Sequence, residues 1–183
     1  MCGLKSLPPA GVCWTKCRKY GKPASTDLQI RQAISSDVEP LIDLQRRTIS
    51  ASYRSFLGDE SVDGFVNSGA IDTYVMENLE RCVVITGNSK IVGCCVTKDN
   101  LIDLLMIHHE HHRSGLGTLL LRHVEDTLFR RHDELILESF ANNRQAFDFY
   151  RKSGWSQVRA FRDPSSGHDK LVFVLRRAIT TSN

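Results

Sequence analysis

The sequence contains no long hydrophobic run. No apolar stretch in its 183 residues approaches the roughly 18 residues that a bilayer crossing needs, so we expect no membrane-spanning helix. The chain also lacks the two spaced cysteine pairs that are typical of a zinc site. Three cysteines lie in apolar, strand-like runs, which is typical of buried thiols in a reducing, cytoplasmic compartment. The six cysteines are Cys2, Cys13, Cys17, Cys82, Cys94 and Cys95.

A strong charge of one sign is missing as well. The net charge of +3 is too small to indicate nucleic-acid binding, so we expect neither a nucleic-acid nor a membrane partner. The charge is nevertheless uneven, because residues 1–26 contain five basic and no acidic side chains, whereas residues 27–183 contain 19 basic and 21 acidic ones. The first segment is also rich in proline and glycine and lacks the apolar core of a secretory signal. We interpret residues 1–26 as a basic, flexible extension, and the alternative is an arm that binds a polyanion. We expect one domain over residues 27–178, followed by a short tail, 179–183.

The apolar periodicity of the remaining chain predicts an alternating order of strands and helices. A helix opens at a capping box, Ser36 to Glu39, and a short second helix with flanking loops is expected between Ser52 and Leu79. Further helices are expected over residues 116–128 and 143–152, the second ending at Gly154. Strands are predicted over residues 28–33, 82–86, 91–97, 101–107, 135–140, 155–161 and 171–175. This order predicts an α/β fold with a mixed sheet.

A glycine-rich turn joins the strand 101–107 to the helix 116–128. Its sequence is His112-Arg113-Ser114-Gly115-Leu116-Gly117-Thr118. Glycines let the backbone approach a ligand closely, and the first turn of a helix offers free N–H groups and positive potential to a phosphate. A Walker loop is excluded because no lysine follows the glycines, and a dinucleotide fingerprint is disfavoured because its third glycine is absent.

The turn resembles the acyl-CoA signature of the GNAT acyltransferases, R/Q-x-x-G-x-G/A. A second signature of that family follows as Asn143-x-x-Ala146-x-x-Phe149-Tyr150-x-x-x-Gly154-Trp155. The resemblance implies a mostly antiparallel sheet of six or seven strands with about four helices. It also implies transfer of an acetyl group from acetyl-CoA, without a metal, to a primary amine of a small molecule or peptide. One position departs from the signature, since His112 stands where the family has Arg or Gln, and we expect weaker cofactor binding there.

The same resemblance assigns residues to the cofactor. The backbone of Leu105, Met106 and Ile107 would bind the pantetheine arm and the acetyl carbonyl. Asn143 would contact the cofactor arm beside Phe149, and Tyr150 would protonate the departing thiolate as a general acid. The alternative for Tyr150 is a purely structural core position. The pyrophosphate would lie on His112 and on the backbone of Arg113, Ser114, Gly115, Leu116, Gly117 and Thr118.

A catalytic base is harder to identify. Asp103, on the strand 101–107, and Glu138, on a strand expected to splay away from it, are the two candidates, and a water relay or no dedicated base are alternatives. The cluster His108 to His112 lacks the i, i+4 spacing of a helical metal site, so we interpret it as solvated loop histidines.

The acceptor is suggested only by charge. Between Asp59 and Glu80 the sequence has six acids and no Lys or Arg, which favours a cationic amine, with a solvated acidic helix as the simpler interpretation. A non-catalytic acyl-CoA-binding module is the alternative to an enzyme, because of His112 and the missing base. Homodimers are common in the family, although the sequence has no interface signature.

Overall fold

The computed structural model describes residues 27–164 and 166–177. The predictions for the basic segment 1–26, for Cys2, Cys13 and Cys17, and for the tail 179–183 lie outside the described residues. Within the described part of the chain, no helix is long and apolar enough to cross a membrane.

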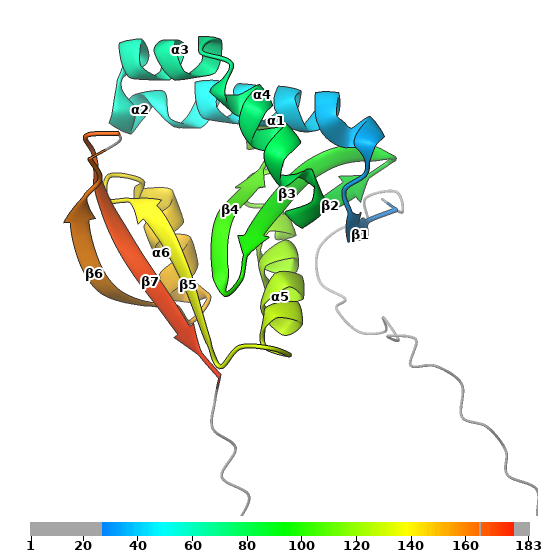
Figure 1. Ribbon diagram of the computed structural model, residues 1–183, viewed down its shortest axis with the longest axis vertical. Coiled ribbons are helices and arrows are strands. Elements are labelled where there is room, and N and C mark those ends of the chain that lie inside the picture. Colours follow the sequence, from blue (N-terminus) through cyan, green and yellow to red (C-terminus); the bar gives the residue numbers. More distant parts are fainter. Residues whose placement is uncertain (1–26, 165, 178–183) are drawn as a thin grey trace, which may run out of the picture.

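The described residues form a seven-stranded mixed sheet in the order β1-β2-β3-β4-β5-β7-β6 (Figure 1). All neighbours are antiparallel except β4 and β5. This confirms the predicted fold class, and β4 has the predicted bounds. The strands are β1 (Gln29–Gln32), β2 (Cys82–Gly87), β3 (Lys90–Lys98), β4 (Leu101–Ile107), β5 (Glu134–Phe140), β6 (Ser156–Arg162) and β7 (Asp169–Arg176).

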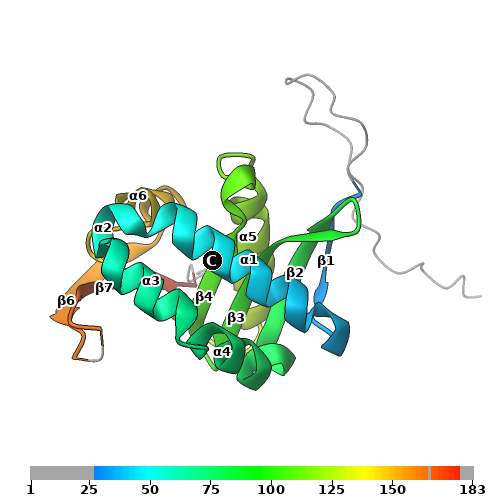
Figure 2. The ribbon, with the colours of Figure 1, turned by 90° about the horizontal axis from the view of Figure 1, so that it is seen from above.

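Helices cover both faces of the sheet (Figures 1 and 2). One core lies beneath the first four helices and contains Cys94, whereas the other lies beneath α5 and contains Cys95. Adjacent strand residues point to opposite faces, so these neighbouring thiols serve as small apolar side chains in different cores. The helices are α1 (Val38–Ser52), α2 (Arg54–Leu57), α3 (Asp59–Asn67), α4 (Ala70–Asn78), α5 (Leu116–Leu128) and α6 (Arg144–Lys152), with 3-10 turns η1 (Ser35–Asp37), η2 (Leu79–Arg81) and η3 (His109–His111).

The prediction of one short helix between Ser52 and Leu79 was wrong, because this segment forms α2, α3 and α4. The breaks lie at Gly58, with φ 84°, and at Gly69, with φ 79°. Only glycine adopts such positive φ values without strain, so each of these two residues ends one helix and redirects the chain into the next. Gly64 lies inside α3 and breaks nothing.

The entry to α1 depends on Asp37 and not on the predicted capping box from Ser36. The Asp37 carboxylate accepts a hydrogen bond from the Ile34 N–H at 2.9 Å and two from the Arg31 guanidinium at 2.6 and 2.9 Å. The bond from Arg31 holds the pKa of the buried Asp37 carboxyl below its usual range. This ion pair therefore fixes β1 to the start of α1, the helix that covers the site.

We expect Asp37→Asn to lower the free energy of unfolding by about 2 kcal/mol at pH 7, because a buried charge-assisted pair is broken. The lowered pKa of Asp37 means that its contribution is present above the unfolded-state pKa near 4 and is lost as the pH falls below it. Urea unfolding of both proteins between pH 3 and 7 measures this difference. A difference in the free energy of unfolding that stayed constant between pH 3 and 7 would contradict the stabilising role of the Asp37 carboxylate.

Candidate active site

β4 and β5 separate at the centre of the sheet. They pair in parallel only at Leu101 with Ile136 and at Ile102 with Leu137, and no further pairs of these two strands occur among the described residues. Beyond Ile102, β4 keeps its antiparallel pairing with β3 up to Ile107. A wedge therefore opens along one edge of β4, as predicted for the strand that carries Glu138.

The strand register decides which backbone groups of β4 face the wedge. The His108 N–H donates to the Val92 carbonyl at 2.9 Å, so alternate residues of β4 bond β3 and the others turn away. Met106 is opposite Cys94 and belongs to the bonded set. The N–H and C=O groups of Leu105 and Ile107 thus face the wedge, whereas those of Met106, which also lines the first cleft, are directed toward β3.

The glycine turn leads into α5 beside this wedge. Gly115 is the N-cap of α5 with φ 86°, and Arg113 also has a left-handed backbone, with φ 62°. A Cβ atom placed on Gly117 would lie 3.5 Å from the Phe149 ring, which is an ordinary van der Waals contact, so α6 packs beside the first turn of α5 at this point. The turn and both helices border a cleft of about 580 Å³. Free N–H groups at the start of α5 make this cleft suitable for an anion.

His112 has a structural role that the sequence did not reveal. Its Nε2 atom lies 2.9 Å from the Ile107 carbonyl oxygen and its Nδ1 atom lies 3.2 Å from Nε2 of Gln145. With Nε2 protonated, the ring donates to β4 and accepts from α6. Both ring nitrogens are therefore used in joining β4, the glycine turn and α6, which leaves the phosphate contacts at this residue to its backbone.

The second sequence signature forms the N-terminus and the inner face of α6. Asn143 caps the helix, since its Oδ1 atom accepts from the Ala146 N–H at 3.1 Å, and its amide nitrogen is left to bond a ligand. Tyr150 is only 7% exposed and its ring packs against Phe149, Trp155 and Phe173. Burial raises the pKa of Tyr150, so the phenol keeps its proton at neutral pH.

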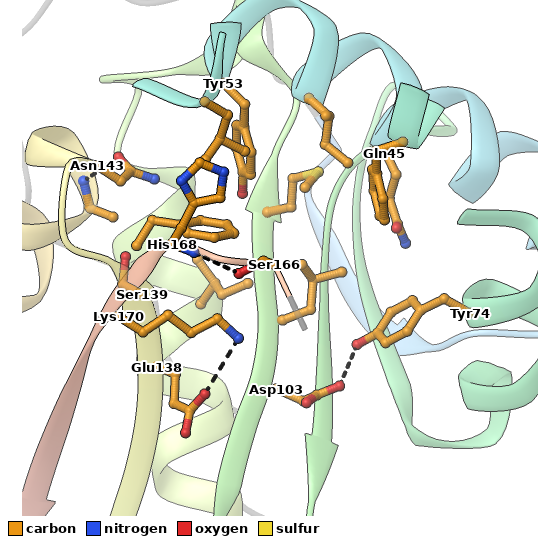
Figure 3. Close-up of a pocket in the computed structure, with 18 of the residues that line it drawn as sticks. Gln45, Tyr53, Tyr74, Asp103, Glu138, Ser139, Asn143, Ser166, His168 and Lys170 are labelled. Carbon is orange, nitrogen blue, oxygen red and sulfur yellow. Dashed lines mark hydrogen bonds and ion pairs between the residues drawn. The ribbon is translucent and has the colours of Figure 1, made fainter. Parts of the chain in front are cut away.

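A second cleft, of about 660 Å³, lies between β4, β5 and the helices α1 to α4. Figure 3 shows its side chains converging from both sides of β4. The two clefts meet, because one set of residues lines both. This shared set is Tyr53, Leu105, Met106, Asn143, Ala146 and Tyr150. A thioester in the first cleft and a nucleophile in the second would thus come together beside Tyr150.

The two predicted carboxylates lie on different sides of the second cleft (Figure 3). The Oδ2 atom of Asp103 accepts from the Tyr74 hydroxyl at 2.6 Å and lies 2.9 Å from Nζ of Lys98. Burial and this hydrogen bond raise the pKa of Tyr74, which therefore stays protonated. Glu138 has one looser ion pair, with Oε2 3.7 Å from Nζ of Lys170.

The acids between residues 59 and 80 do not line the second cleft, which agrees with the simpler interpretation of a solvated acidic helix and removes their support for a cationic amine. Arg54 pairs with Asp59 at 3.1 Å and with Asp63, and Arg46 pairs with Asp72 at 2.6 Å. None of the six acids lines the cleft. Their partners precede the acidic run in the sequence, so the run seemed uncompensated only because the folding of α1 and α2 against α3 and α4 was unknown.

Several cleft residues were not found from the sequence, because each stands alone outside any motif. Tyr53 and Gln45 come from α1 and its C-cap, and His168 and Lys170 from the turn into β7. The Tyr53 phenol belongs to the shared set, and burial raises its pKa as it does for Tyr150. These residues gather only when distant elements pack, so no spacing rule could have indicated them.

The histidine cluster lies at η3, outside the second cleft. His108 and His109 stack with ring centroids 4.4 Å apart, and Nδ1 of His108 lies 3.8 Å from Oε2 of Glu110. Within residues 27–164 and 166–177, no group of three or more His, Cys, Asp or Glu side chains is arranged to hold a metal ion.

Comparison with known proteins identifies the family and the fold. Residues 47–164 match the family described as the acetyltransferase (GNAT) domain. The fold is similar to that of the PaiA N-acetyltransferase from Thermoplasma acidophilum in complex with coenzyme A (TM-score 0.70, 17% identity, 82% of this chain and 99% of that chain). It is also similar to a GCN5-related N-acetyltransferase from Rhodopseudomonas palustris (TM-score 0.72, 14% identity, 87% and 100%). A third similar structure is the ribosomal-protein-S18-alanine N-acetyltransferase from Escherichia coli (TM-score 0.61, 19% identity, 85% and 99%). No curated protein sequence matches the chain.

Proposed function

The chain belongs to the GNAT acetyltransferase family, and from that premise we propose that it transfers the acetyl group of acetyl-CoA to a primary amine of a small molecule or peptide. The observation that carries this proposal is the junction of the two clefts at Tyr150, Leu105 and Asn143. One cleft has the anion-binding features that the cofactor needs, and the other is open to an acceptor. Direct attack of the amine on the thioester follows, because the clefts meet at one place.

We assign the first cleft to acetyl-CoA. The backbone N–H groups from Arg113 to Thr118 would hold the pyrophosphate, with the positive end of α5 behind them. The free N–H and C=O groups of Leu105 and the N–H of Ile107 would bond the pantetheine arm in the place where β5 leaves β4. The amide nitrogen of Asn143 would add a contact from α6. No metal enters this scheme.

The chemistry requires the neutral amine to form a C–N bond while the C–S bond breaks. The attacking nitrogen loses one proton and the departing sulfur gains one, so the products are an N-acetyl amide and the free thiol of coenzyme A. An N–H donor from β4 would stabilise the oxyanion of the tetrahedral intermediate. Tyr150 would donate its proton toward the sulfur, because its raised pKa keeps the phenol protonated.

We assign the acceptance of the amine proton to Glu138, directly or through water. Among the described residues, its only ion pair is the 3.7 Å contact with Lys170, whose Nζ atom lies nearer to Asp163, at 3.0 Å. The Oδ2 atom of Asp103, in contrast, already accepts from Tyr74 and contacts Lys98 at 2.9 Å. Glu138 is therefore the freer carboxylate of the two, and Asp103 serves to hold the wall of the cleft.

The test is thiol release from acetyl-CoA on addition of an amine panel to the full-length chain. We expect release that depends on both amine and protein, and a mass increase of one acetyl group on the acceptor. Calorimetric binding of acetyl-CoA with no release across the panel would contradict the transferase proposal and favour the non-catalytic acyl-CoA-binding module. Comparing acetyl-CoA with propionyl-CoA and butyryl-CoA tests the acetyl preference.

We also propose the bounds of the acyltransferase domain, its cellular compartment and its oligomeric state. The acyltransferase unit spans residues 27–178, outside the basic segment 1–26 and the tail 179–183. The three free thiols Cys82, Cys94 and Cys95 support a reducing, cytoplasmic compartment. A homodimer is the assembly that the family resemblance implies, and sedimentation of the full-length chain measures it.

A further inference from the structure

Gln45 carries a carboxamide to the second cleft without a hydrogen-bond partner. The residue is only 5% exposed and lines this cleft from the middle of α1. Among residues 27–164 and 166–177, neither its oxygen nor its nitrogen is hydrogen-bonded. Neither atom is fully enclosed, and Figure 3 shows the side chain directed into the cleft. A largely buried amide whose oxygen and nitrogen have no protein partner is well placed to receive one donor and one acceptor from a ligand.

Each of the two carboxylates of the same cleft has a cationic neighbour. Asp103 is paired with Lys98 at 2.9 Å, and Glu138 lies 3.7 Å from Lys170, which it shares with Asp163 at 3.0 Å. The acids of α3 and α4 are turned away from the cleft, as described above. Additional ammonium groups of a polyamine would be favoured by additional carboxylates, and the lining offers only Asp103, held by Tyr74 and Lys98, beside the Glu138 that serves the reacting amine.

The helical side of the cleft is apolar. Side chains from four successive helices form it, and its polar residues are Gln45 and Ser61 beside Tyr74 and Tyr53. Such a surface favours an acceptor with a hydrocarbon body, because burying apolar area is the main driving force available there. The apolar residues on this side are Ile49, Leu57, Val62, Phe65 and Ile71.

We propose that the acceptor is an apolar primary monoamine that bears a neutral amide, and that the Gln45 carboxamide recognises this amide. The inference rests on the proposed acetyl transfer to an amine in this cleft. Gln45 lines the acceptor cleft and not the cofactor cleft, so it contacts the body of the acceptor and not the reacting nitrogen. It is a specificity-determining residue, since an amide can satisfy its donor and its acceptor together.

The experiment compares L-leucinamide with 3-methylbutylamine, which keeps the hydrocarbon body and lacks the amide, on the wild type and on Gln45→Leu. Because the two amines differ in pKa, their kcat/KM values are not compared directly. The quantity compared is the ratio of the two kcat/KM values, measured once for the wild type and once for the variant. We expect Gln45→Leu to lower kcat/KM for leucinamide about tenfold and to leave that for 3-methylbutylamine within about twofold. Gln45→Met replaces Gln45→Leu if the latter lowers the unfolding midpoint.

Two results would overturn the inference. One is an equal loss of kcat/KM for both amines in the variant, and the other is spermidine as the preferred acceptor of the wild type. Calorimetric titration of leucinamide into the full-length chain with coenzyme A separates this inference from the proposed function. Leucinamide binding that Gln45→Leu weakens about tenfold, without thiol release from any amine, would support the recognition and contradict the transfer.

Discussion

Replacing Tyr150 with phenylalanine is expected to lower kcat about 100-fold while the affinity for acetyl-CoA stays the same. The change removes one hydroxyl and keeps the ring, which packs against Phe149, Trp155 and Phe173 in the core. Because Tyr150 lies where the two clefts meet, the proposed mechanism loses its proton donor to the departing sulfur when the hydroxyl is removed. Thiol release under saturating acetyl-CoA measures kcat, and calorimetry measures the binding of the cofactor.

Tyr53→Phe is the matched control for this prediction. Tyr53 also lines both clefts, and burial raises its pKa in the same direction. If Tyr150 is the proton donor, Tyr53→Phe should change kcat by less than about fivefold. A 100-fold loss in Tyr53→Phe with normal turnover in Tyr150→Phe would instead assign the proton to Tyr53.

Regular periodicity explains why most of the fold was predictable. The strand Leu101–Ile107 and the helix Leu116–Leu128 have the predicted bounds, since each shows one clear period bounded by turn residues. The stretch from Arg54 to Asn78 was not predictable in this way. Gly58 and Gly69 divide it into three short helices, but a glycine does not by itself indicate a break in a helix, since Gly64 lies inside α3.

More residues of the first cleft than of the second could be identified from the sequence. The glycine turn and the α6 signature are contiguous in sequence, so their residue types and spacing carry the information. Gln45, Tyr74 and His168 come from three separate elements and have no local pattern that distinguishes them from core or surface residues. Their convergence depends on how α1 and α4 pack over β4, which a single sequence does not specify.

The two edges of β4 have different partners, and this difference links the fold to the proposed chemistry. One edge pairs with β3 along the strand, so the backbone of β4 is rigidly held. The other edge is released where β5 departs after Leu137, and its peptide groups are left for a ligand. Buried peptide groups need partners, so an extended chain such as pantetheine can take the place of the missing strand. Asp103 lies at a bulge of β4 between these regions, where Leu104 pairs with Val96 and Ile102 with Thr97.

Trp155→Ala is expected to lower the free energy of unfolding by about 3 to 5 kcal/mol, because the largest fully buried side chain leaves a cavity behind it. The indole N–H also donates to Oε1 of Glu125 at 2.7 Å, in a place where burial raises the pKa of that carboxyl. Urea unfolding measures the loss, and Trp155→Phe helps to separate its causes, since it keeps one aromatic ring while it removes the N–H and part of the indole volume. We expect Trp155→Phe to cost less than half as much, because ring packing against Tyr150 dominates. An equal cost for both variants would assign the stabilisation to the bond with Glu125.

The packing argument also requires a lower kcat in folded Trp155→Ala, because Tyr150 loses a ring that fixes its position at the junction of the clefts.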